Sequence, residues 1–242
     1  MQLQVKVGCC GYPVSKVKYY ENFDVVEIQS TFYKLPKIET AIKWREEVPA
    51  NFEFIVKAWQ AITHPWGTPT WRRYGKTPPG KLENYGFLRY TEENIKAWNM
   101  TVEICKALKC SKVVIQLPPK LILSEDNIDE IKQFLGYTLK SGLRIIVEPR
   151  HQSWNNEEIK RFFKEKGIVH CVDPFKDKDW GTGDFHYYRL HGINGYNYSY
   201  KYTDDDLRYL VRIISSCEKD VYVMFNNKFM FVDAIRFKEI IK

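Results

Sequence analysis

The stretch Lys112-Val113-Val114-Ile115-Gln116-Leu117 is a near-continuous apolar run that begins at Lys112 and is interrupted only by Gln116 near its end. A strand that is buried on both faces has this pattern, whereas a strand with one solvent-exposed face alternates apolar and polar residues. Arg144-Ile145-Ile146-Val147 has the same character and is followed directly by Glu148. The two runs therefore indicate a parallel sheet that is covered on both sides.

The other short apolar runs complete a set of strands that alternate with helices. Six further runs rich in Val, Ile, Phe or Tyr occupy 5–9, 24–28, 52–56, 167–172, 185–190 and 220–225. Stretches with apolar residues at helical spacing lie between them, at 38–48, 91–109, 124–140, 155–166, 203–217 and 232–241. Repeated βα units of this kind predict a (β/α)8 TIM barrel.

Three segments depart from a regular barrel. The stretch 12–20 is short for a helical unit, and 174–184 contains too much Asp, Lys and Gly to form a regular helix. The segment 58–90 is far longer than the ~2 to 6 residues that usually connect a strand to a helix. We therefore predict a somewhat distorted barrel with a long loop after the third strand.

Composition sets the outer limits. The chain has 242 residues, 44% of them hydrophobic, and no long linker, so we expect a single domain over 1–242. No run approaches the ~18 consecutive apolar residues that cross a bilayer, and the sequence begins with a strand-like run, so we expect a cytoplasmic protein without a membrane partner. The six cysteines form no Cys-x-x-Cys pair and fit small buried hydrophobes. The formal charge of +7 favours anionic partners.

The long loop concentrates aromatic and basic residues. It contains Trp59, Trp66 and the run Trp71-Arg72-Arg73-Tyr74. Aromatic rings interleaved with cations can stack on bases or sugars while the cations meet phosphates. The tryptophans can equally well pack the loop down onto the barrel. The sequence leaves a lid and a nucleic-acid surface open as alternatives.

Charged side chains stand at the ends of several predicted strands, among them Glu27, Lys57, Glu148 and Arg189. The C-terminal strand ends of a TIM barrel converge on one face, so these groups should share a pocket. A buried carboxyl group whose pKa is moved by its neighbours can transfer protons near neutral pH. We expect Glu148 and Glu27 to be catalytic, although Glu148 fits a structural ion pair as well. Lys57 is a third candidate, as an electrostatic clamp or as a nucleophilic amine.

Other strand-end residues are suited to binding a substrate. Arginine presents a planar fork that matches phosphate or carboxylate, and a glycine-containing loop after the seventh strand of such a barrel often binds phosphate. The substrate-binding residues expected from these positions are Arg150, Arg189, His191, Gly192, Asn226 and Asn227.

Metal binding is left open by the residue types. Glu27, Glu148, His151, Asp173 and His191 are of the right kinds for a divalent ion, but no close pair such as His-x-His occurs. We predict no cofactor and no metal ligands, and keep a divalent metal as an alternative.

Seven segments in order along the chain resemble the YecE-like family, also named domain of unknown function 72. They are Gly8-Cys-Cys-Gly-Tyr12, the stretch 23–36, Phe54-Ile-Val-Lys-Ala58 with Ile62-Thr-His64, Gln116-Leu-Pro-Pro119, Val147-Glu-Pro-Arg-His151 with Ser153-Trp154, Tyr188-Arg-Leu-His-Gly192 and Phe225-Asn-Asn227.

The resemblance implies a TIM barrel whose biochemical activity is not established. Its segments add Tyr33, His64 and Trp154 to the expected substrate-binding residues. This sequence departs from the family pattern in its first segment, where Cys9, Cys10 and Tyr12 stand in place of a more usual Thr-Ser-Gly-Trp. It departs again at Gln29, where Asn is more usual.

Three functions remain open at this point. The first is an enzyme that performs acid–base chemistry on a phosphorylated or carboxylated small molecule at the C-terminal face of the barrel. The second is a nucleic-acid-binding barrel, in the manner of a metal-dependent phosphodiesterase or endonuclease. The third is a non-catalytic ligand sensor. The sequence does not fix the oligomeric state.

Overall fold

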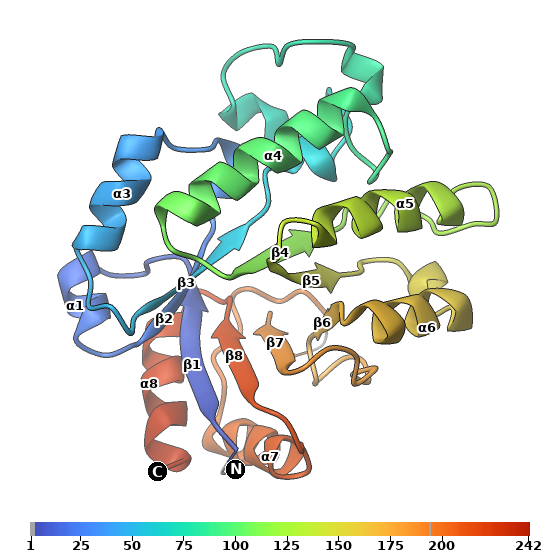
Figure 1. Cartoon of the computed structure of the whole chain (residues 1–242). Helices are drawn as coiled ribbons and strands as arrows, with labels where there is room; N and C mark the ends of the chain where they lie inside the picture. Colours follow the sequence, from blue (N-terminus) through green and yellow to red (C-terminus); the bar gives the residue numbers. More distant parts are fainter. Residues whose placement is uncertain (1–2, 194) are drawn as a thin grey trace.

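The computed structural model describes residues 3–193 and 195–242. Eight parallel strands close into a barrel in which each strand pairs with its neighbours in chain order, and β8 returns to β1 (Figure 1). The strands are β1 Val5–Cys10, β2 Val25–Ile28, β3 Glu53–Lys57, β4 Lys112–Gln116, β5 Arg144–Glu148, β6 Val169–Val172, β7 His186–Leu190 and β8 Val221–Phe225. The predicted TIM barrel and its long loop after β3 are confirmed.

The strands are buried on both faces, as their continuous apolar runs predict. Ile55, Val114, Ile146, Tyr187 and other inward-pointing residues form one cluster inside the barrel. A larger apolar cluster fills the layer between the strands and the surrounding helices. The pairing register of the strands aligns polar residues at one end of the barrel. Gln116 at the end of β4, for example, lies beside Glu148 at the end of β5.

Helices surround the barrel and cover most of its outer face (Figure 1). They are α1 Lys16–Tyr20, α2 Ser30–Tyr33, α3 Ile38–Glu46, α4 Glu92–Ala107, α5 Ile128–Leu139, α6 Glu157–Lys166, α7 Asp204–Ser215 and α8 Met230–Ile240. Local sequence sets their ends: Thr203 and Asp206 form a capping box at the start of α7, and Gly167 ends α6 with φ of 66°. Among the described residues, no helix is both long enough and apolar enough to span a membrane.

The barrel is distorted where the sequence predicts it. The first helix, α1, has only five residues. Between β6 and β7, the described chain forms turns over residues 174–184 and no helix. A gap is therefore left beside α6, and it shapes the site described below.

The long loop folds down onto the barrel through its tryptophans. It contains three short 3-10 helices, η1 Gln60–Ile62, η2 Pro69–Arg73 and η3 Leu82–Asn84. Trp59 and Trp71 are only 3% and 4% exposed, and Trp71 Nε1 donates a hydrogen bond of 3.0 Å to the His64 carbonyl. These two rings are core residues, whereas Arg72 and Arg73 are exposed. The structure therefore favours packing over base stacking for the two tryptophans.

Candidate active site at the mouth of the barrel

Arg189 lies at the centre of the polar cluster inside the barrel mouth. Its side chain is fully buried, with Nη2 3.0 Å from Glu27 Oε1 and Nη1 paired with Glu148 Oε2. Tyr187, two residues earlier on β7, faces the same interior, and its hydroxyl donates a hydrogen bond of 2.8 Å to Glu27 Oε2. One arginine therefore joins carboxylates from β2 and β5, two strands that are not neighbours in the barrel.

Glu148 is shared between two arginines. Its Oε1 lies 2.8 Å from Arg150 Nη2, while Oε2 pairs with Arg189. Burial alone would raise the pKa of Glu148, but Arg150 and Arg189 outweigh burial and hold that pKa well below its usual range. Glu148 is consequently an ionised carboxylate near neutral pH, and it compensates two buried cations.

His191 is a neutral imidazole between two acidic residues. Burial lowers its pKa, although Asp173 and Glu148 act in the opposite direction. Its Nε2 lies 3.2 Å from Arg150 Nη2, and a guanidinium can only donate. Nε2 must then be the acceptor, so the ring proton resides on Nδ1, which is 3.4 Å from Asp173 Oδ2. Asp173 also accepts a 2.9 Å hydrogen bond from the His191 backbone N–H.

Lys57 is a buried lysine held by two glutamine side chains. It is 7% exposed, and its Nζ donates hydrogen bonds to Gln116 Oε1 at 2.8 Å and to Gln29 Oε1 at 3.3 Å. Burial, followed by the charge of Arg189, lowers the pKa of Lys57 to about 8. Gln29 Nε2 in turn donates to Glu27, so a hydrogen-bonded chain connects Lys57 with the carboxylate cluster.

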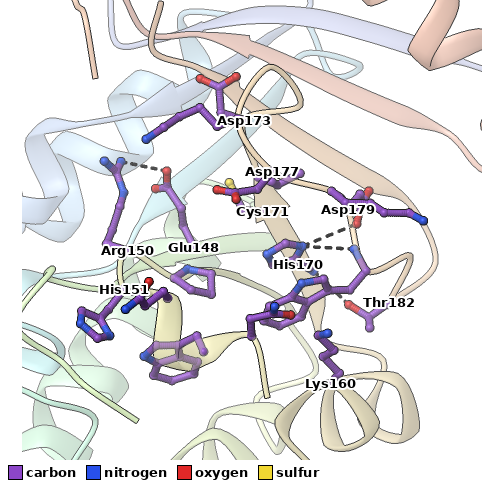
Figure 2. Close-up of a pocket in the computed structure, with 18 of the residues that line it drawn as sticks. Glu148, Arg150, His151, Lys160, His170, Cys171, Asp173, Asp177, Asp179 and Thr182 are labelled. Atoms are coloured by element: carbon purple, nitrogen blue, oxygen red, sulfur yellow. Dashed lines mark hydrogen bonds and ion pairs between the residues drawn. The ribbon is translucent and has the colours of Figure 1, made fainter. Parts of the chain in front are cut away.

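A cavity of about 860 Å³ opens beside this cluster, between α6 and the turns that replace a helix after β6. Glu148 and Arg150 face each other at one part of it, and His170, Asp179 and Lys160 line the rest (Figure 2). This volume is within the range of ~300–1,000 Å³ that is typical of small-molecule sites.

Two predicted binding residues, His64 and Tyr33, both pack against Phe32 of α2. The ring of Phe32 is 4.3 Å from Lys57 Nζ and 5.0 Å from the His64 ring. Burial and the charge of Lys57 lower the pKa of His64 to about 4, so this ring is neutral. Tyr33 follows Phe32 in α2, and the guanidinium of Arg73 lies 4.4 Å above its ring. His64 is therefore close to the cluster, while Tyr33 lies under the long loop.

The remaining predicted residues have structural contacts. Trp154 is fully buried and lines the cavity. Its Nε1 donates a hydrogen bond of 3.0 Å to the Leu121 carbonyl. Asn226 is half-buried, and its backbone N–H extends the β8 pairing by donating to the Leu190 carbonyl. Asn227 Nδ2 donates a hydrogen bond of 2.8 Å to Asp233 Oδ2 in α8.

The glycine loop after β7 is stabilised by its own chain. Gly192 has φ of 86°, and its backbone N–H donates a hydrogen bond of 2.7 Å to the Tyr202 hydroxyl. The N–H of His191 is held by Asp173, as described above. Both backbone N–H groups thus already donate hydrogen bonds within the protein. Arg150 is therefore a better candidate than this loop for binding an anion. Asn194, within this loop, lies outside the described residues.

Several residues of the site are absent from the binding and catalytic sets predicted above, among them Tyr187, Asp173 and the cavity-lining Lys176 and Tyr196. Tyr187 could have been predicted from the sequence, because it precedes Arg189 by two residues on the same strand and its side chain must therefore lie on the same face. Asp173 could have been predicted as well, as a polar residue after a strand. Lys176 and Tyr196 lie in irregular loops, where no periodicity indicates which side chains meet.

No group of three or more His, Cys, Asp or Glu side chains within 3–193 and 195–242 is arranged to hold a metal ion. Of the candidate ligands, Glu148 is already in contact with Arg150 and Arg189, and His191 with Arg150. His151 turns to Ser153, with Nδ1 2.8 Å from that hydroxyl.

Comparisons with known proteins place the chain among relatives of unestablished activity. The family model described as protein of unknown function DUF72 matches residues 16–239. The UPF0759 protein YunF of Bacillus subtilis (strain 168) is 25% identical over an alignment 248 residues long, which covers 86% of this chain and 79% of YunF.

Solved structures of DUF72 proteins share the fold. The crystal structure from Enterococcus faecalis V583 superposes with a TM-score of 0.76 at 20% identity, covering 99% of this chain and 98% of the other. That from Thermotoga maritima MSB8 gives a TM-score of 0.67 at 23% identity, over 98% and 99%. The resemblance predicted from the seven sequence segments is confirmed.

Proposed function

This chain belongs to the DUF72 family of proteins of unknown function, and we propose that it is an enzyme that performs acid–base chemistry on an anionic small molecule. The observation that carries the proposal is the position of Arg150, a buried cation at the wall of a cavity of about 860 Å³, at the same barrel mouth as Lys57, a lysine with a lowered pKa. Anion binding and proton transfer then take place at one barrel mouth.

Arg150 is the group that anchors the anion in this proposal. Its side chain is 7% exposed, and both of its polar contacts, to Glu148 and to His191, are made by Nη2. Arg189 is a poorer candidate, because it is fully buried between Glu27 and Glu148.

Lys57 is the proton-transfer residue in this proposal. A pKa of about 8 gives a substantial neutral fraction at mildly alkaline pH, so the amine can accept a proton there and return it later. Glu148, whose pKa is held low, is a weak base and serves as a positioning residue for both arginines. Glu27 supports Lys57 through Gln29.

Proton transfer can be detected without knowledge of the product. The protein is incubated in D2O with a panel of phosphorylated and carboxylated small molecules, and deuterium incorporation into carbon-bound positions is followed by NMR. We expect incorporation into at least one compound, and loss of at least 100-fold of its rate in Lys57→Met. The matched control is Lys140→Met, which alters an exposed lysine at the end of α5. Equal rates in the two variants would contradict the role of Lys57.

A further inference from the structure

The cavity beside the barrel mouth contains positive charge that its own carboxylates do not balance. Four of its cations form no ion pair with any carboxylate of the described chain: Arg161, Lys164, Lys176 and Lys178. Four of its five carboxylates have partners: Glu148 with Arg150, Glu157 with Lys160, Asp173 with His191 and Asp179 with His186. Histidines are the partners of Asp173 and Asp179 and bring no permanent charge, so the six lysines and arginines of the cavity outnumber its five carboxylates by one, and the cavity favours an anionic ligand.

The buried end of the cavity has a cation with unused donors. Arg150 Nη2 contacts Glu148 and His191, and Nε has no acceptor among the described residues. Leaving a buried donor unpaired costs about 1–3 kcal/mol. The hydrogen bond and ion pair that Arg150 makes with His191 and Glu148 both use Nη2, so the Nη1 donors remain for a ligand oxygen.

Tyr196 brings a second cation to the same place. The Arg150 guanidinium carbon lies 4.1 Å from the centre of the Tyr196 ring, and Lys176 Nζ lies 3.5 Å from the same centre. Both cations line the cavity, and Tyr196 lines it with them. The ring, which is 43% exposed, thereby holds a surface lysine from the turns after β6 close to a buried arginine from β5.

We propose that Arg150, Lys176 and the Tyr196 hydroxyl form a phosphate site, and that the substrate is a phosphorylated small molecule. This proposal rests on the proposed function and names its substrate class. A carboxylate carries one charge, and Arg150 alone matches it. A phosphate monoester carries close to two charges at neutral pH and several acceptor oxygens, which matches an arginine fork, an ammonium group and a hydroxyl together.

The rest of the cavity has room for the organic part of such a molecule. A bare phosphate would fill only a small part of 860 Å³. Beyond His170, one wall is the indole of Trp180, which stacks on the His170 ring at 3.8 Å with an interplanar angle of 3°. Lys160, with Nζ 5.8 Å from the centre of that indole, borders the same region (Figure 2). The phosphate end therefore lies near the barrel mouth and the organic end lies along α6.

The test compares small anions at pH 8 and constant ionic strength. The unfolding midpoint of the full chain is measured against the concentration of inorganic phosphate, sulfate and acetate, and dissociation constants are obtained from the shifts. We expect phosphate and sulfate to bind at least tenfold more tightly than acetate. Lys176→Ala should weaken the binding of phosphate at least fivefold and leave the binding of acetate nearly unchanged. Tyr196→Phe should weaken phosphate binding by a smaller factor.

The control is Lys166→Ala, which removes an exposed lysine at the end of α6 and outside the cavity. Lys176 is itself exposed, so its variant should fold normally. Equal affinity for phosphate and acetate, or the same phosphate affinity in Lys176→Ala and Lys166→Ala, would overturn the phosphate site. Deuterium exchange that depends on Lys57 but not on Lys176 would refute this inference alone. Phosphate binding without exchange in any phosphorylated compound would instead refute the proposed enzyme.

Discussion

Arg150 Nη2 lies 2.8 Å from Glu148 Oε1 and 3.2 Å from His191 Nε2, so one guanidinium nitrogen connects the C-terminal ends of β5 and β7. Arg189 reaches the other oxygen of Glu148 from β7. A single carboxylate thus fixes two arginines, one fully buried and one at the wall of the cavity. The first prediction follows from this arrangement.

Glu148→Gln should strongly destabilise the fold. The neutral amide no longer compensates the charges of Arg150 and Arg189, so Glu27 is the one carboxylate left in contact with this pair of arginines. Removing one partner of a buried ion pair costs about 3–5 kcal/mol. Glu157→Gln is the control, because Glu157 is 90% exposed in its pair with Lys160 and should change stability by less than about 1 kcal/mol. Urea denaturation measures both variants, and equal losses would contradict the structural role of Glu148.

Acid should unfold the protein partly through the same residue. The folded-state pKa of Glu148 is lowered from 4.5, so its contribution to stability is present above about pH 4.5 and is lost as the pH falls toward the folded-state pKa. The free energy of unfolding should therefore decrease between pH 5 and pH 3 in the wild type. In Glu148→Gln this decrease should be shallower, and parallel pH profiles for the two proteins would refute the prediction.

Lys57→Met should stabilise the protein near neutral pH while removing activity. The lysine has a folded-state pKa of about 8 against 10.5 for the free group, so its protonation opposes folding below pH 8, and this cost disappears as the pH rises to 10.5. The gain at pH 7 should be on the order of 1–3 kcal/mol, because the lost hydrogen bonds to Gln29 and Gln116 offset part of it. The difference should shrink on titration to pH 10, and a destabilised variant at pH 7 would be inconsistent with the lowered pKa.

Trp71→Ala should destabilise the barrel. The indole is 4% exposed and packs against Trp59, Trp66 and Tyr85, so its removal should cost about 3–5 kcal/mol in thermal or urea unfolding. Met100→Ala, at a side chain that is 51% exposed, should cost far less. If the loop were a base-stacking surface, Trp71→Ala would leave stability unchanged and weaken the binding of short single-stranded DNA.

The sequence predicts the barrel and the innermost polar group well, for identifiable reasons. The runs at 112–117 and 144–147 indicate strands buried on both faces, and barrel geometry then brings Glu27, Glu148 and Arg189 together because they stand at strand ends. The alternation along β7 also places Tyr187 beside Arg189. These relationships depend only on strand periodicity and closure.

The properties of the site that depend on loop geometry could not be predicted. The pairing of Lys176 with Tyr196 requires two irregular segments to meet, and nothing in either segment specifies the other. The pKa of Lys57 depends on its burial and on its distance from Arg189, which sequence spacing does not supply. The burial of Trp59 and Trp71 likewise follows from how the long loop folds onto the barrel.

The most direct measurement is an NMR titration of the lysine side chains, with the protein labelled on lysine Cε and Lys57→Met used for assignment. We predict that one lysine signal titrates near pH 8, and that this signal is absent from Lys57→Met. If every lysine titrates in the ordinary range near 10.5, Lys57 is fully charged at neutral pH and the proposed proton transfer through it is contradicted.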